Sequence, residues 1–346
     1  MTGPEVEPEE FAGFHSRTLE WDHYEKLIEA SPVAIATEVD AGRWDVAQSD
    51  DRVADDVARA ELAAAPWWLW WNVLSLDAPM VAIAWALVFA KCAGVKLPGA
   101  EVATLGLLVW LIYTVDRLLD GRWSARDDGG AFGSPLRQRH FFHRIYAPGI
   151  VWVAAGVAAF TAILVVARIG EQVLKLAAPV GLTLVLYMAW VHLGRRKILS
   201  RLPKEAAVGA IFAAGVALPA WSRLGARRWE FFLLAILFAA VCTLNCVAIE
   251  EWERARGRTL GTSSSHGAAT DLGSGRFAVG LAVCAALMTP VVRLRGEFSA
   301  IGAAIAVSAL LILFLDLVRQ RISADGLRVL VDVALLAPAL VVLAVR

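Results

Sequence analysis

Long apolar stretches alternate with short polar ones from residue 67 to the end of the chain. A helix that crosses a membrane needs about 20 mostly apolar residues. The apolar stretches have about that length, although several are near its lower limit. They predict nine transmembrane helices, at residues 75–93, 100–115, 148–167, 173–193, 206–222, 229–249, 277–292, 299–317 and 326–345.

A tryptophan cluster precedes the first of these stretches. Pro66 is followed by Trp67, Trp68, Trp70 and Trp71. Tryptophan prefers the interface between lipid and water, so the cluster marks the entry into the bilayer. Residues 1–66 contain 16 acidic and 5 basic residues and no long apolar run. We therefore predict an acidic N-terminal cytoplasmic segment at 1–66 and a transmembrane domain at 67–346.

Composition agrees with a polytopic membrane protein of the all-α class. The 346 residues are 58% hydrophobic and only 19% charged, which argues against a series of soluble domains. Net charge is zero, so the N-terminal acids are balanced by a basic membrane domain with no sign of nucleic-acid binding. Lys and Arg gather in the loops at 116–147, 194–205, 250–276 and 318–325, which predicts a cytoplasmic N-terminus in an inner membrane. The first thirty residues lack the apolar core of a cleavable signal peptide.

The first motif with candidate chemistry ends the second predicted helix. Asp116 and Asp120 are four residues apart and share one helix face, with Tyr113 one turn earlier. Two carboxylates on one face repel each other unless a cation lies between them. Mg²⁺ prefers such oxygen ligands and often bridges to phosphates. The alternative is two solvated acids paired with Arg117 and Arg122.

A second acidic motif ends the sixth predicted helix. Glu250 and Glu253 share a helix face, and Asn245 lies one to two turns earlier. Acids near bilayer depth usually face the interior of the bundle. Two acidic helix ends on one side of the membrane predict a shared metal site. The alternative is a charged helix end paired with Arg254 and Arg256.

Basic residues lie on the same predicted side. They are candidates for binding a diphosphate, because Arg, Lys and His provide charge-assisted hydrogen bonds. The alternative is that they only set the orientation of the chain. The candidates are Arg137, Arg139, His143, Arg196, Lys197 and Lys204. His192, at the end of the fourth predicted helix, is interpreted as structural.

These motifs together resemble the UbiA superfamily of intramembrane prenyltransferases. The matching stretches are 113–120, 186–209 and 245–260, and the resemblance covers roughly residues 67–346. It implies a nine-helix bundle with a central cavity, Mg²⁺ held by Asp116, Asp120, Glu250 and Glu253, and a prenyl diphosphate as substrate. Tyr113, Tyr187 and Asn245 are then further site residues. The chain departs from the family pattern at Ile112 and Ile249, where the family has Asn and an acid.

Three functions are compatible with this pattern. The first is Mg²⁺-dependent ionisation of an isoprenoid diphosphate and transfer of the prenyl group to a lipophilic acceptor. The second is a terpene cyclase, which ionises the same substrate without an acceptor. The third is a non-catalytic membrane protein that binds a lipid or a partner. The missing Asn at Ile112 and the Glu residues that replace Asp in the second motif favour this third function.

Overall fold

The computed structural model describes residues 59, 62–63, 65–127, 142–143, 145–193, 204–225, 228–259 and 297–345. The chain divides into two compact units, Met1–Ala64 and Ala65–Arg346. Only the second is described at length, and all the helices named below belong to it. Its described residues form helices and no strand, as the all-α prediction requires.

The described helices follow the predicted apolar stretches. They are α4 (Trp67–Val73), α5 (Asp77–Cys92), α6 (Gly99–Asp127), α8 (Ala147–Arg168), α9 (Glu171–Leu193), α10 (Lys204–Trp221), α11 (Arg228–Thr259), α13 (Glu297–Val318), the short 3₁₀ helix η3 (Arg319–Arg321) and α14 (Ala324–Ala344). The predicted segment 277–292 lies outside the described residues. Two helices are longer than predicted: α6 has 29 residues and α11 has 32. Both acidic motifs therefore lie within helices, because Leu, Arg and Glu favour continued helix beyond the apolar run.

Six of the described helices are long and apolar enough to cross a membrane. They are α6, α8, α9, α11, α13 and α14. The pair α4 and α5 is bent by 80° and adds a seventh span if it is counted as one. Ser75 lies in this bend with a φ of 59°, a left-handed conformation that is uncommon outside glycine. These helices indicate an integral membrane protein.

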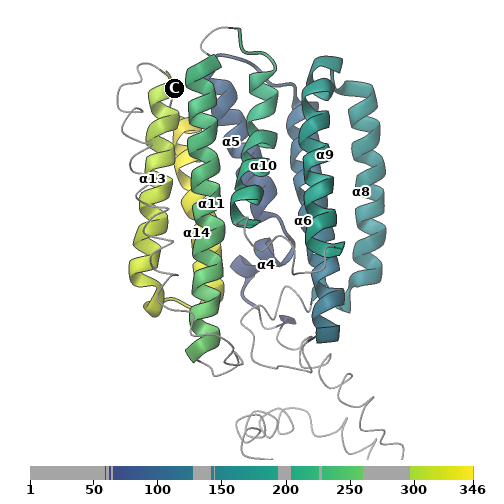
Figure 1. Cartoon of the computed structure of the whole chain (residues 1–346), viewed down its shortest axis with the longest axis vertical. Helices are drawn as coiled ribbons and strands as arrows, with labels where there is room; N and C mark the ends of the chain where they lie inside the picture. The colour runs from purple at the N-terminus through teal and green to yellow at the C-terminus, as the bar shows by residue number, and fades with distance from the viewer. Residues whose placement is uncertain are drawn as a thin grey trace, which may run out of the picture. The chain divides into compact units, whose positions relative to one another are not determined.

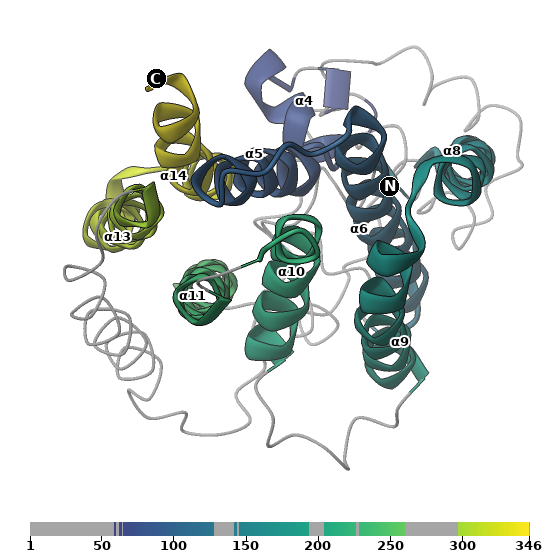
Figure 2. The same cartoon turned by 90° about the horizontal axis from the view of Figure 1, so that it is seen from above.

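The long helices stand side by side and roughly upright in Figure 1, and Figure 2 shows the same bundle from above. Helix α10 packs against α11, α5 and α9, while α14 packs against α13 and α5. Helices α5, α10, α11, α13 and α14 supply most of the buried core. Helix α8 packs against α6 and α9 packs against α10, so these two lie at one side of the bundle (Figure 2).

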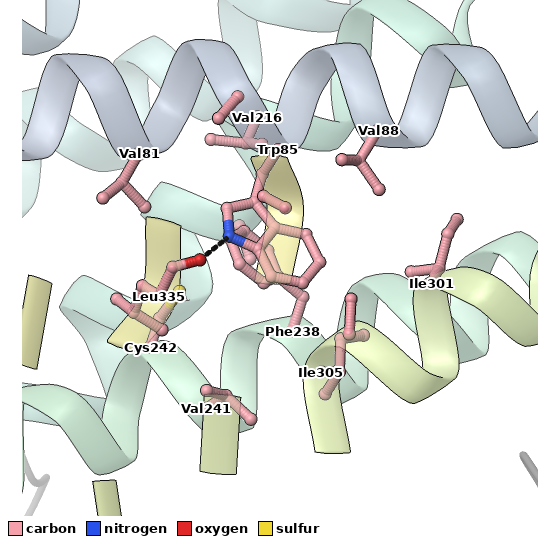
Figure 3. Close-up of a cluster of buried hydrophobic side chains, with 14 of the residues drawn as sticks. Val81, Trp85, Val88, Val216, Phe238, Val241, Cys242, Ile301, Ile305 and Leu335 are labelled. Atoms are coloured by element: carbon pink, nitrogen blue, oxygen red, sulfur yellow. Dashed lines mark hydrogen bonds between the residues drawn. The ribbon is translucent and has the colours of Figure 1, made fainter. Parts of the chain in front are cut away.

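Trp85 is the centre of the buried core (Figure 3). Its side chain is fully buried, and its ring lies 4.4 Å from that of Phe238 on α11. Its indole Nε1 donates a 2.9 Å hydrogen bond to the backbone oxygen of Leu335 on α14. A buried indole N–H needs such a partner, and this one joins α5 to α14.

Close packing of α10 on α11 depends on Gly209. A Cβ atom placed there would meet the backbone nitrogen of Thr243 at 2.7 Å and the Ala239 oxygen at 2.9 Å. Small residues let membrane helices approach each other in this way. The tight contact holds the ends of α10 and α11 together, and it is these ends that carry Lys204 and Glu250.

Helices α8 and α9 are apolar on nearly all sides and little covered by protein. Only Ala154 and Thr161 of α8 are buried, and Trp152 and Val166 are exposed by 79% and 87%. In water such surfaces would be an aggregation hazard, but lipid acyl chains cover them without cost. The exposure agrees with the membrane assignment.

Candidate functional site

A cavity of about 540 Å³ lies between α6, α8, α9 and α10. Its walls are mostly Leu, Ile, Val and Phe side chains, and Cys246 adds one contact from α11. Along α6 it extends from Glu101 to Asp116. Fifteen residues of helix are about 22 Å long, so the cavity is elongated along the bundle. Its volume is within the range of ligand pockets.

The cavity exists because small residues face it from two helices. Gly181 of α9 and Gly215 of α10 both line it, and neither has any atom within 4 Å of the place where a Cβ would stand. Larger side chains at these two positions would fill the space. The sequence thus leaves room where a tightly packed bundle would place side chains.

One end of the cavity is marked by Asp116 of α6 and His192 of α9. The His192 Nε2 and Asp116 Oδ1 atoms are 3.1 Å apart. The His192 side chain is 8% exposed and that of Asp116 is 44% exposed, so the carboxylate remains open to solvent. Met188, one turn before His192, lines the cavity. The interpretation of His192 as structural is therefore incomplete, because it orients a carboxylate at the cavity end.

Lys204 and Glu250 extend the same end from α10 and α11. The Lys204 Nζ lies 3.3 Å from Glu250 Oε1. Each is one helical turn from a residue that lines the cavity, Val208 for Lys204 and Cys246 for Glu250. We call Asp116, His192, Lys204 and Glu250 the charged rim. Four helices contribute one residue each.

Glu205, next to Lys204 on α10, adds a second carboxyl group beside Glu250. Partial burial, a side-chain hydrogen bond with Glu250 and the charge of Glu250 raise the pKa of Glu205, against a smaller lowering by its backbone hydrogen bond and by Lys204. Two neighbouring carboxylates cannot both ionise freely, so one tends to keep its proton. Lys204 partly offsets the negative charge that remains.

The opposite end of the cavity is polar as well. Glu101 and Thr104 of α6 both line it and are 5% and 6% exposed. Oε1 of Glu101 accepts from Arg223, which follows α10. Oε2 of Glu101 and the hydroxyl of Thr104 are buried without a hydrogen-bond partner. Neither Glu101 nor Thr104 belongs to one of the motifs identified in the sequence.

The predicted metal ligands do not converge among the described residues. Glu253 accepts two hydrogen bonds from Arg328 of α14, from Nε at 3.0 Å and from Nη2. Asp116 and Glu250 have His192 and Lys204 at their oxygens. The described part of the chain contains no group of three or more His, Cys, Asp or Glu side chains placed to hold a metal ion. The described side chains alone do not complete a Mg²⁺ site, and the side chain of Asp120, the fourth predicted ligand, is not among those described.

Arg117 pairs with Asp77 of α5 and not with Asp116. Its guanidinium donates to the backbone oxygen of Asn72 and to the hydroxyl of Ser75, both at 2.6 Å, and lies 3.6 Å from Asp77 Oδ2. Asn72 in turn donates to Asp77 at 2.8 Å. The side chains of Arg117 and Asp77 are each 7% exposed, so this ion pair is buried. The alternative in which Arg117 is a solvated partner of Asp116 is wrong, because Asp77 is its partner.

The other predicted site residues have mixed placements. Tyr113 and Tyr187 line the cavity, and the Tyr187 ring stacks edge-on with Trp190 at 6.0 Å. Asn245 has a buried side-chain oxygen without a partner. His143 is 3% exposed beside Phe142 and does not line the cavity. Outside the described residues or side chains lie Asp120, Arg137, Arg139, Arg196 and Lys197.

Known proteins provide no further guide to this site. The cavity, its charged rim and its second polar end have to be interpreted from their own geometry. Comparison of the chain with protein-family models, with curated proteins and with solved structures finds no match.

Proposed function

We propose that the chain is an intramembrane enzyme that acts on an isoprenoid diphosphate. In this proposal the bundle has nine helices of the UbiA kind, the hydrocarbon chain occupies the cavity and the diphosphate lies at the charged rim. The carrying observation is the elongated apolar cavity that ends at Asp116, a residue of the first acidic motif. The proposal places the diphosphate at this motif and the hydrocarbon chain in the elongated cavity beside it.

The lining of the cavity supports a lipophilic chain as the occupant. Branched aliphatic side chains of α6, α9 and α10 form most of the wall. Burial of apolar surface contributes about 25 cal/mol per Å², so a chain of several isoprene units gains affinity along its whole length. Tyr113 and Tyr187 add aromatic faces that stabilise a carbocation by cation–π attraction.

The charged rim supports an anionic headgroup only in part. Lys204 is 59% exposed and provides a donor for phosphate oxygens. Asp116 and Glu250 repel the same anion. The sequence predicts Mg²⁺ at this site. A divalent cation would offset the repulsion, because it neutralises the negative charge of a departing diphosphate. The assay below therefore tests whether diphosphate release requires Mg²⁺.

Diphosphate release is the direct test. The full chain, purified into nanodiscs, is incubated with prenyl diphosphates of several lengths, with and without Mg²⁺ and with candidate aromatic acceptors. We expect release that requires Mg²⁺ and falls at least a hundredfold in Asp116→Asn. Release only with an acceptor identifies a transferase, and release without one identifies a cyclase. No release at any chain length refutes the enzyme proposal.

A matched pair of glycine variants tests whether the hydrocarbon chain of the substrate occupies the cavity. Gly181→Phe fills the cavity from α9, whereas Gly156→Phe adds the same ring to the exposed side of α8. We expect release to fall at least tenfold in the first variant and to stay within twofold in the second. Equal activity of both variants contradicts the assignment of the cavity.

Non-catalytic lipid binding is the second candidate. The observation that favours it is the pairing of Glu253 with Arg328 and of Glu250 with Lys204, which leaves these acids neutralised by the protein itself. This candidate predicts that prenyl diphosphates bind and are recovered intact. Binding must still be lost in Gly181→Phe and kept in Gly156→Phe.

A further inference from the structure

The end of the cavity opposite the charged rim contains two polar atoms that lack a partner. Oε2 of Glu101 and Oγ1 of Thr104 are buried and make no hydrogen bond within the protein. Both residues line the cavity. A buried polar atom left unpaired destabilises the fold, because it has lost its hydrogen bonds to water. The two atoms belong to residues three apart on one helix face, and because both residues line the cavity, a ligand in the cavity can supply their partner.

The environment of Glu101 specifies what this partner has to be. An ionised carboxylate only accepts hydrogen bonds, so Oε2 requires a donor. Its other oxygen already accepts from Arg223, whose own orientation is fixed by a 3.0 Å bond to the Pro219 oxygen and a 3.2 Å bond to Ser222 Oγ. The carboxylate is therefore held in place, with one free oxygen at the cavity.

Charge decides between a neutral and a cationic donor. The Glu101 and Arg223 pair is balanced, and the neighbouring wall at Leu218, Pro219 and Leu174 is apolar. An ammonium group would bring an uncompensated charge into this apolar space, which is costly. A hydroxyl group donates to Oε2, exchanges a second hydrogen bond with the Thr104 hydroxyl and adds no net charge.

We propose that Glu101 and Thr104 form a binding site for the hydroxyl group of a lipophilic alcohol or phenol, whose hydrocarbon part extends into the cavity. The site goes beyond the proposed diphosphate chemistry and does not depend on it. It lies at the other end of the cavity and is filled through a different functional group. Its occupant carries no phosphate, since no Lys or Arg is among the described residues that line the cavity and Arg223 beside it is already paired with Glu101.

Binding of dodecanol tests the site. Tritiated dodecanol is titrated onto the full chain in nanodiscs, with dodecane and dodecylamine as competitors, and empty nanodiscs correct for partition into lipid. We expect dodecanol to bind at least tenfold more tightly than dodecane, which matches it in length but lacks the hydroxyl. Equal affinity of the alcohol and the alkane overturns the proposal. Tighter binding of dodecylamine overturns the assignment of a neutral donor.

Two threonine variants separate the site from general effects on the helix. Thr104→Val removes the cavity hydroxyl at constant shape, and we expect a fivefold to tenfold loss of dodecanol affinity with no change for dodecane. Thr114→Val is the matched control, because Thr114 is on the same helix, is 1% exposed and has an unpartnered hydroxyl, but does not line the cavity. Dodecanol affinity that is unchanged in Thr104→Val, or reduced equally in both variants, overturns the proposal.

Glu101→Gln provides a second measurement. The amide keeps the size of the side chain but weakens the acceptor and leaves Arg223 without its charge partner. We expect a loss of dodecanol affinity at least as large as in Thr104→Val. Thermal unfolding of each variant is recorded in parallel, and affinity is compared among the variants that unfold within a few degrees of the parent chain. Full dodecanol affinity in a folded Glu101→Gln variant overturns the role of the carboxylate.

Discussion

His192 and Asp116 lie 76 residues apart in the chain and form a contact of 3.1 Å between Nε2 and Oδ1. The contact joins α6 to α9 across the end of the cavity. It also gives the only close partner that the structure describes for the first acidic motif: the side chain of Asp120 is not described, and Arg117 pairs with Asp77. The orientation of Asp116 thus depends on a residue of another helix.

His192 is expected to position Asp116 and not to hold the fold together. His192→Ala leaves the half-exposed carboxylate without its partner, and we expect prenyl diphosphate release to fall about tenfold. His192→Gln keeps a donor within reach and should recover most of the activity. Thermal unfolding in detergent should change little in either variant, since exposed or partly exposed ion pairs contribute about 1 kcal/mol or less. Equal loss in both variants contradicts a positioning role.

Glu253 is expected to be structural because Arg328 already binds it. Arg328→Met removes the partner of a largely buried carboxylate and should lower the free energy of unfolding by about 3 kcal/mol. Glu253→Gln combined with Arg328→Met should restore a large part of this loss. The measurement is unfolding in mixed micelles.

The same double variant tests the predicted metal role of Glu253. If Glu253 is a metal ligand, the restored fold will have no diphosphate release. If it is structural, release will stay within threefold of the parent chain. A stable double variant without activity would therefore contradict the structural assignment.

Glu205 is expected to make stability depend on pH. Its folded-state pKa is raised, mainly by desolvation and by the hydrogen bond with Glu250. The native state therefore binds the proton more tightly than the unfolded chain, so this stability is present below the unfolded pKa and is lost as pH rises through the folded pKa. The effect is modest because Glu205 remains partly exposed.

Glu205→Gln removes this titration and retains a hydrogen-bond donor toward Glu250. We expect the variant to be more stable than the parent chain at neutral pH and equal to it in acid, as measured by thermal unfolding across pH. Glu171→Gln is the control, since Glu171 is 81% exposed in a surface pair with Lys175. If the curves of melting temperature against pH are parallel for Glu205→Gln and the parent chain, the prediction is wrong.

Trp85 is expected to stabilise the bundle through one hydrogen bond and its packing. Trp85→Phe leaves the Leu335 oxygen without its indole donor and opens space beside Phe238, at a combined cost of about 2–4 kcal/mol. Trp229→Phe is the control, because Trp229 is 72% exposed and should change stability by less than about 0.5 kcal/mol. Similar melting temperatures of the two variants would show that the core does not depend on Trp85.

Much of the helical framework could be predicted because length and apolar character alone identify a membrane helix. Segments 148–167 and 173–193 coincide with α8 and α9 to within a few residues. Helices α6 and α11 end later than their apolar runs predict. Charged residues outside the bilayer continue both helices, and an apolar pattern cannot detect such residues. The bend at Ser75 was missed, since nothing in the local pattern requires a left-handed residue there.

The site was predicted less completely than the helices. Helical spacing relates residues three or four apart, and it identified Asp116 and Tyr113 as neighbours on one face. It carries no information on contacts between helices, such as Glu253 with Arg328 at a separation of 75 residues. Glu101 and Thr104 do have a weak local signal: an acid and a hydroxyl on one face at the start of a membrane helix. That pattern indicates a binding site only once the cavity beside it is known.

The wall formed by α8 and α9 determines how a ligand reaches the cavity. Val165 of α8 and one side of α9 line the cavity, and much of the remaining surface of both helices is exposed and apolar, as a surface covered by acyl chains would be. A lipophilic ligand dissolved in the bilayer therefore reaches this wall without passing through water. Its effective concentration is its mole fraction in the surrounding lipid. Occupancy should then follow the ratio of ligand to lipid, and fusion with ligand-free vesicles should empty the cavity while the total amount of ligand and the aqueous volume stay constant.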